Sequence, residues 1–137
     1  MPPEFPSAYV HHPDYYSDVG AHVLKTRKYR ETYERFRAEM TIPDASFFEP
    51  RPATVEEVLL VHTREYVDDL LGYRHTHRTL ASELPITKEV IDSYFLATGG
   101  TVLACRLALE HGRALNLTGG FHHCFAAKAE GFCYLHD

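Results

Sequence analysis

The chain is poor in cysteine, has no excess of positive charge and contains no long apolar run. Its three cysteines, Cys105, Cys124 and Cys133, form no paired framework, which predicts free thiols and favours a reducing cytoplasm. Cys124 and Cys133 fit small buried side chains rather than nucleophiles. A formal charge of -5 gives no attraction to nucleic acid. No stretch is long enough to span a bilayer, and Met1-Pro2-Pro3-Glu4 lacks the basic and apolar regions of a signal peptide. We therefore expect a cytoplasmic protein that binds neither nucleic acid nor a membrane.

The length of 137 residues is enough for one domain with a core of ordinary size. Apolar periodicity and turn residues predict short strands among helices, and hence a helix-rich α/β fold. In order, the predicted elements before residue 73 are a strand over 7–10, a helix over 21–40, an extended edge segment at 47–48, a short helix opened by a capping box at 54–57, and a helix between Thr63 and Gly72.

The longest predicted helix spans 88–111, between a capping Thr87 and a closing Gly112. Its apolar residues repeat at intervals of three and four. Gly99 and Gly100 in its middle each cost roughly 1 kcal/mol relative to alanine. Because close packing usually offsets such a cost, we expect this face of the helix to lie directly on a strand or on another helix.

Two adjacent histidines, His122 and His123, follow a glycine pair near the end of the sequence. The apolar residues 114–117 predict a short buried strand, packed by the helix over 88–111. The imidazoles would then project from a loop at the carboxyl end of a strand, where the active sites of open α/β sheets lie. The glycines allow a positive φ or a close approach to a substrate. An adjacent histidine pair also occurs on solvated surfaces, so the dipeptide alone leaves both interpretations open.

The other histidines carry weaker signals. His11 and His12 precede a proline and lack a glycine or apolar frame, which favours an ordinary loop. We expect His62 to be a structural, hydrogen-bonded histidine. The polar segment 73–84 contains two histidines but no acidic or thiol partner at ligand spacing, so we predict a mobile loop rather than a metal site.

Several short patterns occur in a fixed order: Thr98-Gly99-Gly100-Thr101, Ala108-Leu109-Glu110, Leu115-Asn116, Gly119-Gly120-Phe121-His122-His123-Cys124 and Gly131-Phe132-Cys133-Tyr134. Together they resemble the zinc-dependent histone deacetylase family, and most closely its class IV, histone deacetylase 11-like branch and the bacterial relatives. A weaker resemblance covers 10–15 and 21–29. The resemblance implies that residues 1–137 are a single partial domain, the N-terminal part of a three-layer α/β/α parallel-sheet deacetylase domain.

This resemblance implies hydrolysis of an acyl group from acylated lysine or from an acetylated small amine, with Zn²⁺ to activate water and to polarise the carbonyl. It makes His122 the electrostatic partner and His123 the general base and acid, a role that suits imidazole because its pKa lies near neutral pH. Phe132 would line the tunnel that holds the acyl-lysine, and Gly131 would offer its carbonyl to the amide N–H.

The family's zinc ligands, two aspartates and a histidine, lie beyond the position of Asp137. So do the acidic partners of the histidine pair and the tyrosine that polarises the carbonyl. Three interpretations are open. The chain is the N-terminal part of a deacetylase and is inactive alone, or a non-catalytic module that binds proteins or self-associates as a homo-oligomer over its uncovered sheet, or it holds a metal of its own through His122, His123, His136 and Asp137.

Overall fold

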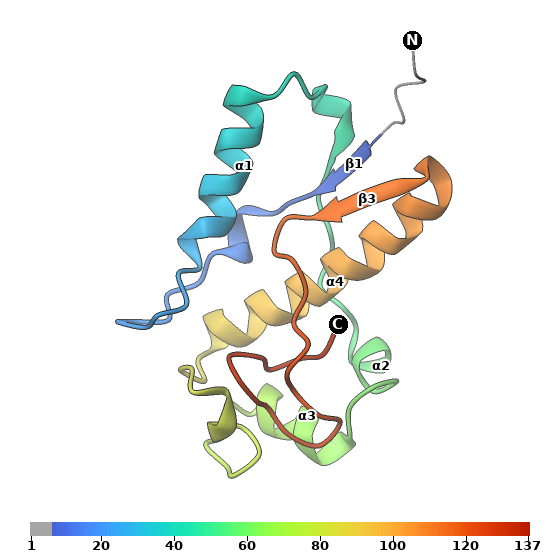
Figure 1. Cartoon of the computed structure of the whole chain (residues 1–137). Helices are drawn as coiled ribbons and strands as arrows, with labels where there is room; N and C mark the ends of the chain where they lie inside the picture. The colour runs from blue at the N-terminus through green and yellow to red at the C-terminus, as the bar shows by residue number, and fades with distance from the viewer. Residues whose placement is uncertain (1–6) are drawn as a thin grey trace.

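The computed structural model describes residues 7–137, so the sequence prediction for Met1–Glu4 lies outside the described residues. Figure 1 shows the strands and α1 in the upper part of the molecule, α2, α3 and the C-terminal segment in the lower part, and α4 running diagonally from the lower part to the strands. The elements are β1 (Ser7–Val10), α1 (Arg27–Glu39), β2 (Phe47–Phe48), α2 (Val55–Val58), α3 (Arg64–Leu71), α4 (Lys88–His111) and β3 (Arg113–Asn116), with 3-10 turns at Pro13–Tyr15, Asp44–Ser46 and Leu80–Ser82.

The strands form a parallel sheet in the order β2-β1-β3. Tyr9 of the central β1 lies opposite Phe47 of β2, and Ala8 lies opposite Ala114 of β3. The predicted strand before the histidines is therefore confirmed, one residue earlier than expected. Its predicted burial is wrong: Leu115 is 48% exposed because β3 has a neighbour on one side only among the described residues.

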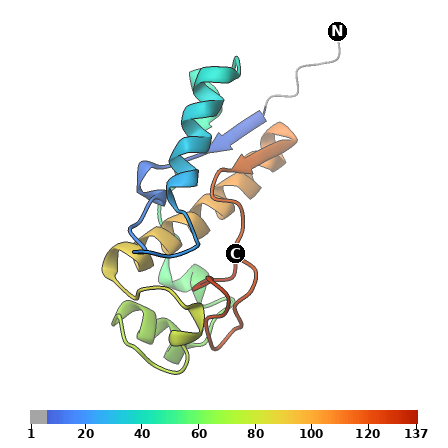
Figure 2. The same ribbon diagram turned by 60° about the vertical axis from the view of Figure 1, so that its left-hand side comes forward.

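Successive side chains of β1 point to opposite faces of the sheet and pack against a different helix on each face. Ala8 and Val10 pack with Ala104 and Leu107 of α4. Tyr9 points to the other face, where its ring meets Phe36 of α1 edge-on with centroids 5.8 Å apart. The result is three layers, α1, sheet and α4, which Figure 2 shows from a second direction. The predicted helix-rich α/β architecture is confirmed.

Helix α4 has the predicted bounds, and Gly112 ends it with φ +85. Its two central glycines lie at close contacts. A Cβ on Gly99 would be 1.9 Å from the carbonyl oxygen of Arg51, in the extended segment before α2. A Cβ on Gly100 would be 2.9 Å from the side-chain nitrogen of Asn116, the last residue of β3. The expected packing of this face against a strand is confirmed.

The main apolar core lies below the sheet, between α3, the first half of α4 and the C-terminal segment. The capping box at Thr54 and Glu57 opens α2 as predicted. Within residues 7–137, no helix is both long and apolar enough to cross a membrane. The most deeply buried residues of this core include Tyr66, Val67, Leu70, Val90, Ile91, Tyr94, Ala129, Tyr134 and Leu135.

Helix α1 begins at Arg27, several residues after the predicted start at residue 21. The preceding residues use side chains to bond the backbone in a non-helical path. The imidazole of His22 accepts from the N–H of Leu24 at 3.0 Å, and the hydroxyl of Thr26 donates to the carbonyl of Ser17 at 2.6 Å. Such local bonds compete with helix formation, so the prediction of helix over 21–26 is wrong.

Candidate active site

The candidate site lies on the irregular segment 117–137, which leaves the carboxyl end of β3 and runs down to the lower helices (Figure 1). Gly119 has φ +70, and its N–H donates to the carbonyl of Asn116 at 2.9 Å, which turns the chain out of the sheet. Two isolated antiparallel bridges, Phe125–Lys128 and Glu130–Cys133, then fold the segment back on itself. The histidine pair thus occupies a loop after a strand, as expected.

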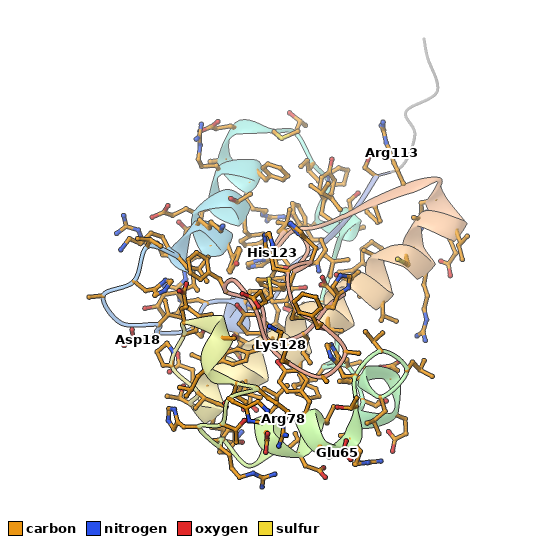
Figure 3. The ribbon with its side chains drawn as sticks, turned by 60° about the horizontal axis from the view of Figure 1, so that its bottom comes forward. Asp18, Glu65, Arg78, Arg113, His123 and Lys128 are labelled. Atoms are coloured by element: carbon orange, nitrogen blue, oxygen red, sulfur yellow. The ribbon has the colours of Figure 1, made fainter. Side chains whose placement is uncertain are left out.

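His122 and His123 are both exposed, and their ring centroids lie 4.2 Å apart with 39° between the planes. Gly131 lies against the second imidazole, because a Cβ at this glycine would be 3.4 Å from Cβ and Cγ of His123. Its φ of +45 is a conformation that glycine adopts without strain. The fold therefore brings the two histidines and Gly131 together. Figure 3 labels His123 on this segment, together with Lys128.

Phe132 has a φ of +64, which is uncommon for a residue with a side chain. Its backbone is held on both sides: the N–H donates to the carbonyl of Ser82 at 3.0 Å, and the carbonyl accepts from the hydroxyl of Tyr94. Its ring is partly exposed and meets His22 edge-on, with centroids 4.7 Å apart. His22 therefore lies beside a predicted site residue that is 110 positions away in the sequence, which no local sequence signal indicates.

The segment 73–84 is organised by the carboxylate of Asp69, whose side chain is only 4% exposed. Nε of Arg78 donates to it at 2.7 Å, Nε of Arg74 at 3.0 Å and the hydroxyl of Thr76 at 2.9 Å. The Arg78 guanidinium first, and then Arg74 and Thr76, hold the pKa of Asp69 at about 2. The prediction of a mobile loop is wrong because the residue that orders it lies outside it, on α3.

This ordered segment supports the candidate site through backbone contacts. The carbonyls of Arg78 and Ala81 accept from the N–H groups of Ala129, at 2.8 Å, and Gly131, at 3.2 Å. Figure 3 shows Arg78 next to the C-terminal segment. Loops without regular structure need such partners for their backbone groups. The polar segment thus fixes the position of the Gly131 backbone relative to His123.

His62 is buried and bridges two parts of the C-terminal segment. Its Nδ1 lies 3.2 Å from the carbonyl of Ala126, and its Nε2 accepts from the N–H of His136 at 3.0 Å. This pattern requires the neutral ring with its proton on Nδ1. Burial lowers the pKa of His62 and so favours that form. The expectation of a structural, hydrogen-bonded histidine is confirmed.

Cys124 and Cys133 are both buried, as expected for small apolar residues. Burial, with a smaller contribution from Cys133, raises the pKa of the Cys124 thiol to about 12. A thiol with so high a pKa supplies almost no thiolate near neutral pH, so Cys124 is unsuited to be a nucleophile.

A model of the histone deacetylase domain matches residues 22–137. The chain belongs to the histone deacetylase family. It is 33% identical over 103 residues to histone deacetylase 2 of Arabidopsis thaliana, a match over 70% of this chain. It is 32% identical over 130 residues to an uncharacterized protein of Picosynechococcus, and 28% identical over 145 residues to the acetoin utilization protein AcuC of Bacillus subtilis, matches over 93% and 96% of this chain.

Crystal structures support the same assignment. An HDAC homolog from Aquifex aeolicus and an HDAC homolog complexed with SAHA each match 95% of this chain with a TM-score of 0.79 at 30% identity. This histone deacetylase family member spans only 27% of the length of the Arabidopsis relative, 43% of the Picosynechococcus relative and 37% of the Bacillus subtilis relative. It spans 38% of each solved chain.

The described residues do not form a zinc site. Across residues 7–137, no group of three or more His, Cys, Asp or Glu side chains could hold a metal ion. Both carboxylate oxygens of Asp137 already accept hydrogen bonds, from the N–H of Phe121 at 2.6 Å and from the hydroxyl of Thr101 at 2.7 Å. The local metal site weighed in the sequence analysis therefore has no support.

Proposed function

We propose that this chain is the N-terminal part of a hydrolase that removes acyl groups from acylated lysine or from an acetylated small amine. The observation that carries the proposal is the pair of exposed imidazoles, His122 and His123, whose ring centroids lie 4.2 Å apart on the loop after β3. Residues 1–137 would be a single partial domain of a protein in the class IV, histone deacetylase 11-like bacterial branch. The Zn²⁺ implied by the resemblance would depend on residues outside this chain.

The role of the pair is proton transfer. An amine leaves an amide efficiently only when a positioned acid protonates it, and such a group typically contributes about 10²- to 10⁴-fold to the rate. We assign the proton transfer to His123, because it is the member in contact with Gly131. His122 would stay as its electrostatic partner.

Gly131 and Phe132 would receive the acylated side chain. The partly exposed ring of Phe132, together with the edge of His22, offers an apolar wall for a methylene stem. Gly131 would accept the amide N–H with its carbonyl, next to the imidazole that handles the proton. The bonds to Ser82 and Tyr94 support this proposal because they fix the Phe132 backbone before any substrate binds.

The test is turnover of an acylated-lysine peptide by the complete product of the gene and by three variants. His123→Ala should lose about 10²-fold or more of kcat, and His122→Ala should lose less, because it removes charge stabilisation rather than the proton carrier. His77→Ala, an exposed histidine in the segment 73–84, is the matched control and should be unchanged. The 137-residue chain alone should be inactive. Equal small losses for His122→Ala and His123→Ala would contradict the assignment.

The alternative function is a non-catalytic module that associates with itself. It is favoured by the edge of β3 that has no strand neighbour among residues 7–137, and by two exposed leucines, Leu115 of β3 at 48% and Leu109 of α4 at 89%. Unpaired strand edges with apolar neighbours promote pairing between chains. Sedimentation of the 137-residue chain distinguishes the two cases: a stable dimer together with an inactive complete product would favour the module.

A further inference from the structure

A series of hydrogen bonds runs from the end of β3 through α4 to the residue before the histidine pair, and the proposed proton transfer does not require it. It begins at Asn116, the last residue of β3. Its Nδ2 donates to the carbonyl of Ala97 at 3.0 Å and to Oγ1 of Thr101 at 3.1 Å. The Thr101 hydroxyl donates in turn to Oδ2 of Asp137 at 2.7 Å. The end of the sheet and the middle of α4 are thereby joined to the C-terminal segment.

Asp137 is in turn hydrogen-bonded to Phe121, the residue directly before His122. Its Oδ1 accepts from the N–H of Phe121 at 2.6 Å, and its own N–H donates to the carbonyl of Phe121 at 3.2 Å. Bonds of backbone N–H groups to carboxylates are charge-assisted and stronger than bonds between neutral groups. Both backbone polar groups of Phe121 are therefore bonded to a single residue.

The direction of each bond in the series is fixed. The carbonyl of Ala97 can only accept, so the amide nitrogen of Asn116 must face Ala97 and Thr101. Oδ1 of Asn116 then faces Tyr15 and accepts from its hydroxyl at 2.8 Å. The Thr101 oxygen then accepts from Asn116, and its own proton goes to Asp137. Gly100 leaves the room for this arrangement, since a Cβ there would lie 2.0 Å from the Tyr15 hydroxyl oxygen. Burial raises the pKa of Tyr15 and of Asp137, as expected for an enclosed network.

We propose that Thr101 and Asp137 are positioning residues for the histidine pair, which they orient by fixing the backbone of Phe121. The catalytic meaning of this role rests on the proposed function. The hydrogen bonds that position Phe121 all lie within this chain, so their effect can be measured in the 137-residue protein without an activity assay. It matters because a small displacement of a catalytic group, on the order of 1 Å, can lower a rate by about 10²-fold.

Three threonine variants of the ¹⁵N-labelled 137-residue chain test the positioning. Thr101→Val keeps the shape of the side chain and removes its hydroxyl, and Thr101→Ser restores a hydroxyl. Thr98→Val is the matched control, because the Thr98 hydroxyl lies on the same helix, is buried and has no hydrogen-bond partner. In Thr101→Val alone, the Phe121 amide should exchange with solvent on the order of tenfold faster. The imidazole ¹⁵N resonances of His122 and His123 should shift in the same variant.

Asp137→Ala removes the carboxylate that joins Thr101 to Phe121 and should produce the same changes, so it tests the proposal even where Thr101→Val folds poorly. The proposal is overturned if either folded variant keeps wild-type exchange at Phe121 and wild-type imidazole resonances. It is also overturned if Thr98→Val changes them as much. In the complete gene product, Thr101→Val should lower kcat about tenfold at unchanged KM, and Thr101→Ser should restore it. A complete wild-type product without hydrolysis would refute the proposed function, while the resonance measurements would still decide the positioning.

Discussion

Replacing Gly99 with alanine reverses the usual effect of this substitution in a helix. In an unobstructed helix interior, alanine would stabilise α4 by about 1 kcal/mol relative to glycine. At Gly99, however, the new Cβ would lie 1.9 Å from the carbonyl oxygen of Arg51 and 2.8 Å from the backbone nitrogen of Ala53. These are backbone atoms, so no flexible side chain can move aside. The segment must shift as a whole, which places the cost in the upper part of the overpacking range, about 2–3 kcal/mol.

The shift would also strain the hydrogen bond from Ala53 N–H to the carbonyl of Phe95, which is 2.8 Å long and is worth about 1 kcal/mol. The gain of about 1 kcal/mol from propensity leaves a net loss of about 2–3 kcal/mol for Gly99→Ala. Urea unfolding of the chain followed by circular dichroism measures it. Ala108→Gly, on the same helix, is the control and should cost about 1 kcal/mol. A Gly99→Ala chain as stable as the wild type, or more stable, would refute the reasoning.

Two further predictions concern the residues that hold the C-terminal segment. The pKa of His62 is lowered in the folded chain, so its stabilising bonds are fully present above the unfolded pKa of about 6.5 and are lost as the pH falls toward the folded value. The stability difference between wild type and His62→Gln, from urea unfolding at several pH values, should therefore shrink between pH 7.5 and 5.5; a constant difference would contradict the tautomer assignment. Asp69→Asn keeps the shape of the side chain but removes the charge that pairs with Arg74 and Arg78. It should lower the free energy of unfolding by about 2–3 kcal/mol, less than the loss of a fully buried ion pair, because both guanidinium groups stay in contact with solvent. Its thermal melting temperature should fall, and an unchanged value would mean that the segment 73–84 is ordered by other contacts.

Features set by short stretches of sequence could be predicted. The bounds of α4 follow from a capping Thr87 and a closing Gly112, and its contact with a strand follows from the cost of two glycines in a helix. The pair His122 and His123 could be placed after a strand because apolar residues and glycines precede it. These signals act within a few positions, where propensity and periodicity carry information.

Features set by distant residues could not be predicted. The polar composition of 73–84 favours mobility, and only the folded chain brings the buried Asp69 to it. The contact between His62 and His136 joins residues 74 positions apart. The exposure of β3 depends on which strands flank it rather than on its own apolar residues. The prediction of a helix from residue 21 failed because side-chain bonds at His22 and Thr26 compete with the helical path.

The segment that carries the histidines has no regular structure, so its geometry depends on the partners that other elements give to its backbone groups. The hydroxyl of Tyr66 on α3 donates to the carbonyl of Tyr134 at 2.5 Å, and the hydroxyl of Tyr134 donates to the carbonyl of Leu84 at 2.8 Å. With His62 and Asp137, these bonds attach the segment at both ends and in the middle. The sheet places the start of the segment, whereas buried polar side chains set the path that follows. Because a buried polar group that loses its partner costs more than a neutral hydrogen bond gains, this path should be disrupted by single substitutions that leave the sheet and α4 intact.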